Sequence, residues 1–160
     1  MDTKAIVFDA YGTLFDVNSA AEKCKDKIGN QWEGFANFWR TTQLEYTWLR
    51  SLMRKHKDFW SVTEESLDKS MKVFKIDSAM KDELLNLYKI LSPYPEVKAV
   101  LSSLKKKNYK LSILSNGTPT LLNELVKSND LENIFDDLFS IEEVGIYKPC
   151  LLYTSPSPRD

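Results

Sequence analysis

Cysteine and histidine are the scarcest chemically useful residues in this 160-residue chain. The two cysteines, Cys24 and Cys150, lie far apart and fit no metal-binding or redox spacing. A disulfide framework is therefore not expected, and the composition favours a reducing compartment, the cytoplasm. The single histidine, His56, lies in the basic stretch RKHKD (residues 54–58), which predicts a solvated loop rather than a catalytic base.

The chain also has almost no net charge, −1 from 22 basic and 23 acidic side chains. No strong field of either sign is available to attract nucleic acid or an anionic membrane. No apolar run is long enough to span a bilayer, and the N-terminus lacks a basic segment followed by a long apolar one. With 42% hydrophobic and 28% charged residues, the composition is that of a globular protein without nucleic-acid or membrane partners.

The most informative segment stands near the N-terminus. Residues 5–8 form an apolar run with β-branched and aromatic side chains, which predicts a short buried strand over residues 4–8. The sequence DAYGTLF (residues 9–15) follows at once, so this strand delivers the carboxylate of Asp9 to its C-terminal end. Ligands of open α/β sheets bind at that edge. Asp9 is therefore a candidate nucleophile that forms a covalent ester, and the simpler alternative is an Asp that caps a turn.

The next part of the chain predicts helices only. Residues 16–92 are rich in aromatic side chains, and no strand pattern interrupts them. Apolar side chains recur near a 3.6-residue period over residues 35–53, which predicts a long amphipathic helix. Ser61 with Glu64 forms a possible capping box for a second helix, and Ser78 is a candidate N-cap for a third.

After this helical segment, strand and helix patterns alternate. Pro95 suits the first position of an amphipathic helix over residues 96–107, and residues 110–114 predict a second strand. A helix from about 118 to 127 and a short strand within 135–141 follow. This order predicts an α/β fold in which helices wrap a parallel sheet and an all-helical segment is inserted after the first strand.

Several polar side chains follow the predicted strands. Ser115 and Thr13 offer hydroxyls that could bind a carboxylate or orient Asp9, and Asn116 offers an amide donor suited to an anion such as a carboxylate or a halide ion. Lys148 precedes a proline, which holds its backbone extended, and its ammonium could pair with Asp9 and keep it ionised. The alternatives are an ordinary Ser-Asn-Gly turn and a solvated surface lysine.

Three motifs in order carry a family resemblance. FDAYGTLF (residues 8–15), SNG (115–117) and GIYKP (145–149) together resemble the haloacid dehalogenase superfamily, and within it the L-2-haloacid dehalogenases. The helical segment WRTTQLEYTWLR (39–50) is similar to the cap of that subgroup. The resemblance covers about residues 3–149, and the ordered set is far more specific than any single motif.

The resemblance implies a Rossmann-like catalytic core formed by residues 1–15 and 93–149, with a helical cap formed by residues 16–92. The family continues beyond GIYKP with a helix, a strand and a fourth loop, whereas residues 150–160 depart from this pattern and look like translated sequencing adapter. We therefore expect a core incomplete at the C-terminus, an irregular tail and weak ester hydrolysis. A non-functional gene fragment stays open as an alternative.

The resemblance also implies a chemistry: Asp9 attacks the halogen-bearing carbon of an L-2-haloalkanoate, and water hydrolyses the ester to a D-2-hydroxy acid. No metal or cofactor is implied, and family analogy suggests a homodimer. Arg40 is expected to reach from the cap and to receive the halide or the substrate carboxylate. The implied catalytic residues are Asp9, Thr13, Arg40, Ser115, Asn116 and Lys148, and the implied substrate-binding residues are Tyr11, Arg40, Ser115 and Asn116.

Tyr11 separates this hypothesis from its main alternative, a Mg²⁺-dependent phosphatase of the same superfamily. Such phosphatases place an Asp at this position as the acid–base group for a leaving alkoxide, whereas a halide is a weak base and needs no proton. A free tyrosine has a pKa of about 10, so Tyr11 is a poor proton donor at neutral pH. Its ring could line the substrate pocket or belong to the core.

Overall fold

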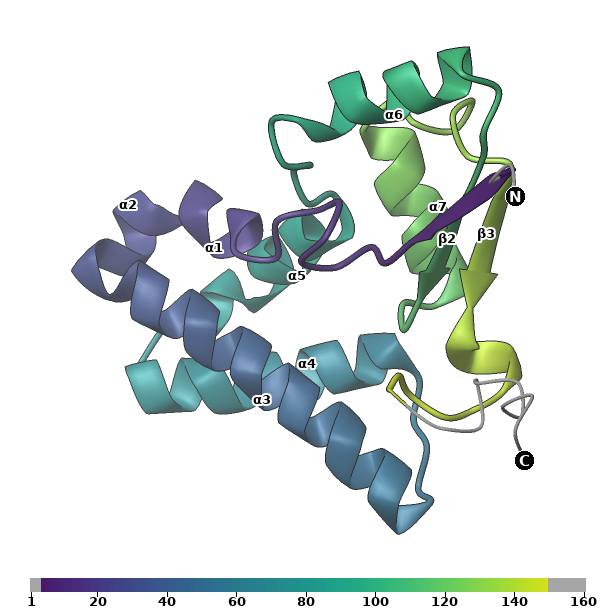
Figure 1. Ribbon diagram of the computed structural model, residues 1–160. Coiled ribbons are helices and arrows are strands. Elements are labelled where there is room, and N and C mark those ends of the chain that lie inside the picture. Colours follow the sequence, from purple (N-terminus) through teal and green to yellow (C-terminus); the bar gives the residue numbers. More distant parts are fainter. Residues whose placement is uncertain (1–3, 150–160) are drawn as a thin grey trace.

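The computed structural model describes residues 4–149, and its centre is a three-stranded parallel sheet (Figure 1). The strands are β1 (Ala5–Phe8), β2 (Lys110–Ser115) and β3 (Asp137–Ser140), in the spatial order β1-β2-β3. Phe8 is in register with Ile113, and Ser115 is in register with Ser140. The predicted α/β fold with a parallel sheet is confirmed, and the three strands end at one edge.

One face of this sheet is covered by two helices. α6 (Val97–Lys106) packs against β2, and α7 (Pro119–Ser128) packs against β3. Right-handed crossovers between parallel strands in this order place both helices on the same face. That face includes the fully buried Leu111 and Ile113 of β2. On the opposite face Val7 and Phe139 remain 56% and 50% exposed, so no described residue covers it fully.

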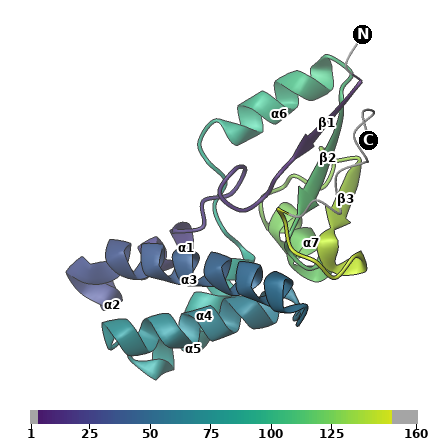
Figure 2. The same cartoon turned by 60° about the horizontal axis from the view of Figure 1, so that its bottom comes forward.

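The remaining helices form a separate layer beside the sheet, which we call the helical layer (Figure 2). α3 packs along α4, and α1 packs against both α3 and α5. The layer contains α1 (Ser19–Lys23), α2 (Lys25–Ile28), the 3₁₀ turn η1 (Gly29–Gln31), α3 (Trp32–Met53), α4 (Phe59–Phe74), the 3₁₀ turn η2 (Ser78–Met80) and α5 (Lys81–Lys89).

The chain enters and leaves the helical layer at neighbouring points. The N–H of Asp16 donates to the carbonyl of Ser92 at 2.8 Å, and the N–H of Tyr94 donates to the carbonyl of Leu14 at 3.0 Å. The two connections therefore run side by side, as an inserted segment requires. The exact boundaries of core and cap stay predictions, and the predicted tail, residues 150–160, lies outside the described residues.

The start of α4 differs from the sequence-based prediction. The helix begins at Phe59 because Asp58, rather than Ser61, is its N-cap. Asp58 Oδ1 accepts a hydrogen bond from the Ser61 N–H at 2.9 Å, and Asp58 Oδ2 accepts one from the Ser61 hydroxyl at 2.6 Å. The predicted capping box of Ser61 with Glu64 is therefore wrong, since the carboxylate one turn earlier takes the free N–H groups.

Two other predicted helix starts differ from the structure by one or two residues. Asp77, rather than Ser78, supplies the capping oxygen, which accepts from the Ala79 N–H at 2.9 Å and starts the 3₁₀ turn before α5. α6 begins at Val97, two residues after Pro95, because the chain makes a turn before the helix. In both places the presence of a helix was predicted correctly, but the residue at which it begins was not.

We expect the substitution Asp58→Ala to lower the free energy of unfolding by about 1 kcal/mol, because it removes the N-cap of α4. Burial raises the pKa of Asp58, but hydrogen bonds from Ser61 more than offset this and hold that pKa below its usual value. The cap therefore stabilises the fold fully above about pH 4 and is lost as the pH falls below that.

Urea unfolding at neutral and acidic pH measures this effect. The exposed Asp26→Ala is the matched control, and its expected change is within about 0.5 kcal/mol. Equal stabilities of Asp58→Ala and Asp26→Ala at pH 7 would contradict the assignment of the N-cap.

Candidate active site

The candidate site lies where the strands end. Asp9 follows β1 directly, and its side chain is 43% exposed. The Nζ atom of Lys148 lies 2.9 Å from Asp9 Oδ1 and also donates to the carbonyl of Leu114 in β2. The structure thus brings the two predicted residues together from distant parts of the chain. Two of the three N–H donors of the ammonium are directed at these acceptors.

Asn116 holds the backbone of Lys148. Its Oδ1 accepts from the Lys148 N–H at 2.9 Å, and its Nδ2 donates to the Lys148 carbonyl at 3.4 Å. One amide side chain therefore brackets one residue of the distant loop. The sequence analysis missed this use of Asn116, and its expected contact with a carboxylate or halide stays a prediction.

Ser115 and Gly117 shape the turn after β2. Ser115 is fully buried, and its hydroxyl accepts from the Gly117 N–H at 3.1 Å. A Cβ atom on Gly117 would lie 2.7 Å from Cε2 and 3.0 Å from Oη of Tyr11. Only glycine therefore lets the Tyr11 ring lie against this turn. In the structure, the Ser115 hydroxyl stabilises the turn through this hydrogen bond. The predicted contact of Ser115 with substrate stays a prediction.

Tyr11 lies in an aromatic slot between the sheet edge and the helical layer. It is 5% exposed, and its ring stacks on Tyr88 at 5.7 Å and packs against Phe59 at 5.1 Å. Burial, followed by the neighbouring Tyr88, raises the pKa of Tyr11 well above its ordinary value. The phenol is therefore neutral at physiological pH. Its hydroxyl makes no hydrogen bond to any other residue in the range 4–149.

Arg40 reaches the same edge from α3. Its Nη2 donates to the Tyr11 carbonyl at 3.1 Å, and its Nη1 donates to Gln43 Oε1 at 2.9 Å. The guanidinium also lies close to Gly12, 3.8 Å from where a Cβ would stand. A permanent positive charge from the helical layer is thus held beside the loop that carries Asp9.

Gln43 and Tyr88 hold Arg40 in place, and the sequence analysis missed both. Gln43 Nε2 donates to Thr63 Oγ1 at 2.6 Å and to Tyr88 Oη at 3.0 Å, which leaves Gln43 Oε1 directed at Arg40. Gln43 and Thr63 are buried polar residues in the contact between α3 and α4. The one feature of the sequence that could have indicated this contact is the position of Gln43 three residues after Arg40. That spacing places both side chains on one side of the helix.

Thr13 is a predicted site residue that forms no side-chain hydrogen bond with the other predicted site residues in the described part of the structure. It is exposed, its N–H donates to the Ala10 carbonyl at 3.3 Å, and its hydroxyl makes no hydrogen bond among residues 4–149. Its role in orienting Asp9 stays a prediction. In the same part of the chain, no group of three or more His, Cys, Asp or Glu side chains is arranged to hold a metal ion, and no helix is long and apolar enough to cross a membrane.

We expect Gly117→Ala to destabilise the protein by about 1–3 kcal/mol, because the added methyl group overlaps the Tyr11 ring. Thermal or urea unfolding measures the loss. Gly34→Ala is the matched control, since Gly34 lies in a helix and a Cβ there meets only the Phe74 ring, at 3.3 Å. A neutral effect of Gly117→Ala would show that Tyr11 does not occupy this place.

Comparison with known proteins identifies close relatives. (S)-2-haloacid dehalogenase 4A of Burkholderia cepacia is 40% identical over 148 residues, which cover 91% of this chain and 64% of that protein. (S)-2-haloacid dehalogenase 1 of Pseudomonas sp. (strain CBS-3) is also 40% identical, with 91% of this chain and 65% of that protein covered. The chain thus spans slightly less than two thirds of the length of these curated relatives.

Solved structures give the same result. The L-2-haloacid dehalogenase from Xanthobacter autotrophicus superimposes with a TM-score of 0.83 at 37% identity, over 96% of this chain and 66% of that one. The same enzyme with chloropropionic acid covalently bound also matches, with a TM-score of 0.83 at 36% identity and the same coverage. The family model for haloacid dehalogenase-like hydrolases matches residues 3–159. This chain belongs to the haloacid dehalogenase-like hydrolase family.

Proposed function

We propose that this protein displaces halide from L-2-haloalkanoates and produces D-2-hydroxy acids. The observation that carries the proposal is the Lys148–Asp9 pair at the sheet edge, with the aromatic Tyr11 where a proton donor would otherwise stand. The names of the relatives support the same substrate class, since they are (S)-2-haloacid dehalogenases.

In the first step, a carboxylate oxygen of Asp9 attacks the carbon that bears the halogen. The new C–O bond forms as the C–halogen bond breaks, and halide leaves with the bonding electrons. Attack from the side opposite the halogen inverts the configuration at that carbon. The Lys148 ammonium at 2.9 Å restricts the orientation of the attacking carboxylate of Asp9.

In the second step, water attacks the carbonyl carbon of the Asp9 ester. The 2-hydroxy acid leaves, the Asp9 carboxylate is restored, and one proton is released to solvent. The net reaction converts haloalkanoate and water into hydroxyalkanoate, halide and a proton. The hydroxyl oxygen of the product thus comes from Asp9, and water replaces that oxygen in the carboxylate.

In this proposal, Arg40 and Tyr11 receive the substrate. Arg40 carries a permanent charge next to the loop of Asp9, so it can bind the substrate carboxylate or the departing halide. Tyr11 remains a neutral phenol, and its hydroxyl can donate a hydrogen bond without transferring a proton. Tyr11, Phe59 and Tyr88 supply an apolar aromatic surface for the carbon chain.

The partners of this reaction are a small 2-haloalkanoate and water. Location in the cytoplasm, assembly as a homodimer and the absence of nucleic-acid partners are further parts of the proposal. The scarcity of cysteine supports the location and the balanced charge supports the absence of nucleic-acid partners, whereas the homodimer rests on family analogy.

The decisive experiment measures covalent modification of Asp9. Incubation with L-2-chloropropionate is expected to add one 1-carboxyethyl group to Asp9, detected by intact mass and peptide mapping, with release of chloride. Asp9→Asn should show neither the added group nor chloride release. More than one chloride per chain indicates complete turnover, including ester hydrolysis. Chelator-sensitive phosphate release from p-nitrophenyl phosphate with Mg²⁺, without ester formation, would instead support the phosphatase alternative.

We expect Gln43→Leu to slow chloride release by tenfold or more, because Arg40 loses the amide that orients it and a displacement of about 1 Å can cost about 100-fold in rate. The measurement is the initial rate of chloride release, or of Asp9 ester formation, at saturating substrate. Gln31→Leu is the matched control, because Gln31 is an exposed glutamine whose amide donates to the Phe74 carbonyl at 3.2 Å, away from Arg40. Equal rates for the two variants would contradict this role of Gln43.

A further inference from the structure

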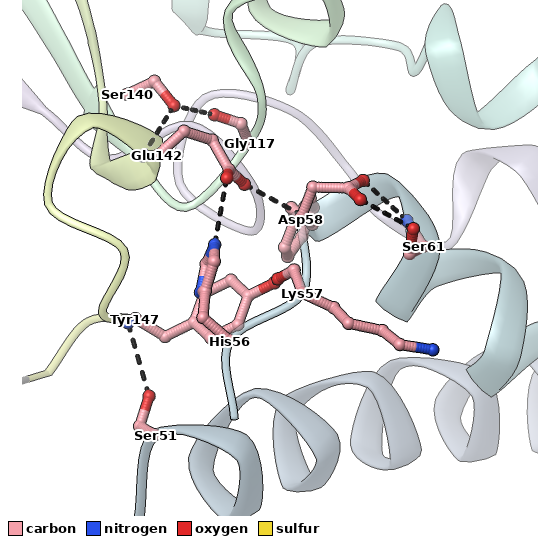
Figure 3. Close-up of polar contacts among 10 residues, drawn as sticks. Ser51, His56, Lys57, Asp58, Ser61, Gly117, Ser140, Glu142 and Tyr147 are labelled. Carbon is pink, nitrogen blue, oxygen red and sulfur yellow. Dashed lines mark hydrogen bonds and ion pairs between the residues drawn. The ribbon is translucent and has the colours of Figure 1, made fainter. Parts of the chain in front are cut away.

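A second polar cluster joins the sheet to the helical layer, and the proposed mechanism does not use it (Figure 3). Its centre is Glu142, in the 3₁₀ turn η3 (Ile141–Glu143) after β3. Glu142 Oε1 accepts from the Phe59 N–H at 3.0 Å, and Oε2 lies 3.0 Å from His56 Nε2. One carboxylate of the sheet side thus binds both the start of α4 and the loop before it.

Tyr147 makes a parallel set of contacts a few residues later. Its hydroxyl donates to the Lys57 carbonyl, and its N–H donates to Ser51 Oγ at 3.3 Å. Its ring is 1% exposed and lies 5.0 Å from the His56 ring. Burial and then the nearby Glu142 raise the pKa of Tyr147, so the hydroxyl remains a hydrogen-bond donor.

The cluster is also anchored to the sheet. The Ser140 hydroxyl donates to the Gly117 carbonyl at 2.7 Å and accepts from the Glu142 N–H at 3.2 Å. The turn after β2 and η3 are therefore connected through one side chain. The backbone of Glu142 is therefore connected, through Ser140, to the turn against which Tyr11 packs.

This cluster is connected to the candidate active site in two ways, once along the chain and once through packed side chains. Tyr147 directly precedes Lys148, so fixing Tyr147 limits where the backbone of Lys148 can lie. Phe59, held by Glu142, packs against Tyr11 at 5.1 Å and faces Tyr147 at 6.4 Å. A shift of residues 51–59 relative to residues 140–147 would therefore move both sides of the site.

We propose that Glu142 and Tyr147 are positioning residues, which tie residues 140–147 to residues 51–59 and thereby fix the Lys148 ammonium at Asp9. This inference rests on the function proposed above. Neither residue contacts Asp9 in the structure, and each acts through its neighbour. Asn116 fixes the Lys148 backbone to the sheet, while Glu142 and Tyr147 tie the same segment to residues 51–59 of the helical layer.

Lysine needs such support because its four-carbon stem is flexible. An exposed ion pair alone orients its partners weakly, since solvent screens the charges and side-chain entropy opposes a single geometry. The position of the ammonium must therefore be set by the backbone from which it extends. Two anchors on either side of the loop set that position better than Asn116 alone.

The first test measures the rate of Asp9 ester formation with excess L-2-chloropropionate in the full chain. Glu142→Leu and Tyr147→Phe should each lower the maximum rate constant by about tenfold, with the half-saturating substrate concentration unchanged within twofold. Glu143→Leu is the matched control, because Glu143 is the exposed neighbour of Glu142. Rates are compared where circular dichroism shows each variant to be fully folded.

A purely structural role has a different signature. It would lower the fraction of chains that react but leave the rate constant of the folded fraction unchanged, and that result would overturn the inference. Glu142→Gln should recover most of the lost rate, because its amide oxygen can still accept from the Phe59 N–H. Failure of Glu142→Gln to recover any rate would likewise count against this role of the hydrogen bond.

A second readout does not depend on the proposed function. Brief acetylation with acetic anhydride, followed by peptide mapping, measures the reactivity of the Lys148 amine against that of the exposed Lys25. Release of Lys148 from Asp9 in Glu142→Leu or Tyr147→Phe should raise its relative reactivity several-fold, with no change in Glu143→Leu. If the unsubstituted chain forms no ester, the proposed function fails and this measurement alone decides the positioning role. Unchanged reactivity in both variants rejects that role.

Discussion

The contact between Lys148 and Asp9 is the interaction on which the rest of the site depends. The two residues are 139 positions apart, and their side chains are 25% and 43% exposed. An ion pair this exposed adds little to stability, so the pair does not bring these segments together. The sheet register places Asp9, and the bracket formed by Asn116 places Lys148. The fold thus creates a contact whose value lies in reactivity rather than in stability.

The charges around Asp9 fit the difficulty of the proposed reaction. A carboxylate must approach a substrate that itself carries a carboxylate, and the two repel one another. Lys148 and Arg40 bring two positive charges to the edge where Asp9 supplies one negative charge. The surplus is one positive charge, which balances the anionic substrate. Because Lys148 comes from the sheet side and Arg40 from the helical layer, this balance exists only when the two parts are docked.

The sequence was sufficient to predict those features of the fold that depend on local residue patterns and on the order of motifs along the chain. Apolar runs identified the strands, and the order of motifs correctly predicted that Lys148 approaches Asp9. What it missed depends on tertiary packing. The inward orientation of the Gln43 amide and the bracket formed by Asn116 exist only once distant segments meet. At the start of α4, Asp58 and Ser61 both offer suitable oxygens within one turn, and only the direction in which the chain enters the helix selects Asp58.

The aromatic slot argues more strongly for halide displacement than the lack of an acid at residue 11 does by itself. Tyr11 fills the space between Phe59 and Tyr88 and lies against Gly117, so its environment is apolar on several sides. An ionised carboxylate in that slot would lose much of its hydration against these rings, although the Arg40 guanidinium lies at the edge of the slot. The surroundings and the residue are therefore matched. Both suit a leaving group that departs as a stable anion and needs hydrogen bonding rather than a proton. Under the proposed function, the helical layer thus takes part in selecting the reaction, because it supplies Phe59 and Tyr88, as well as in covering the site.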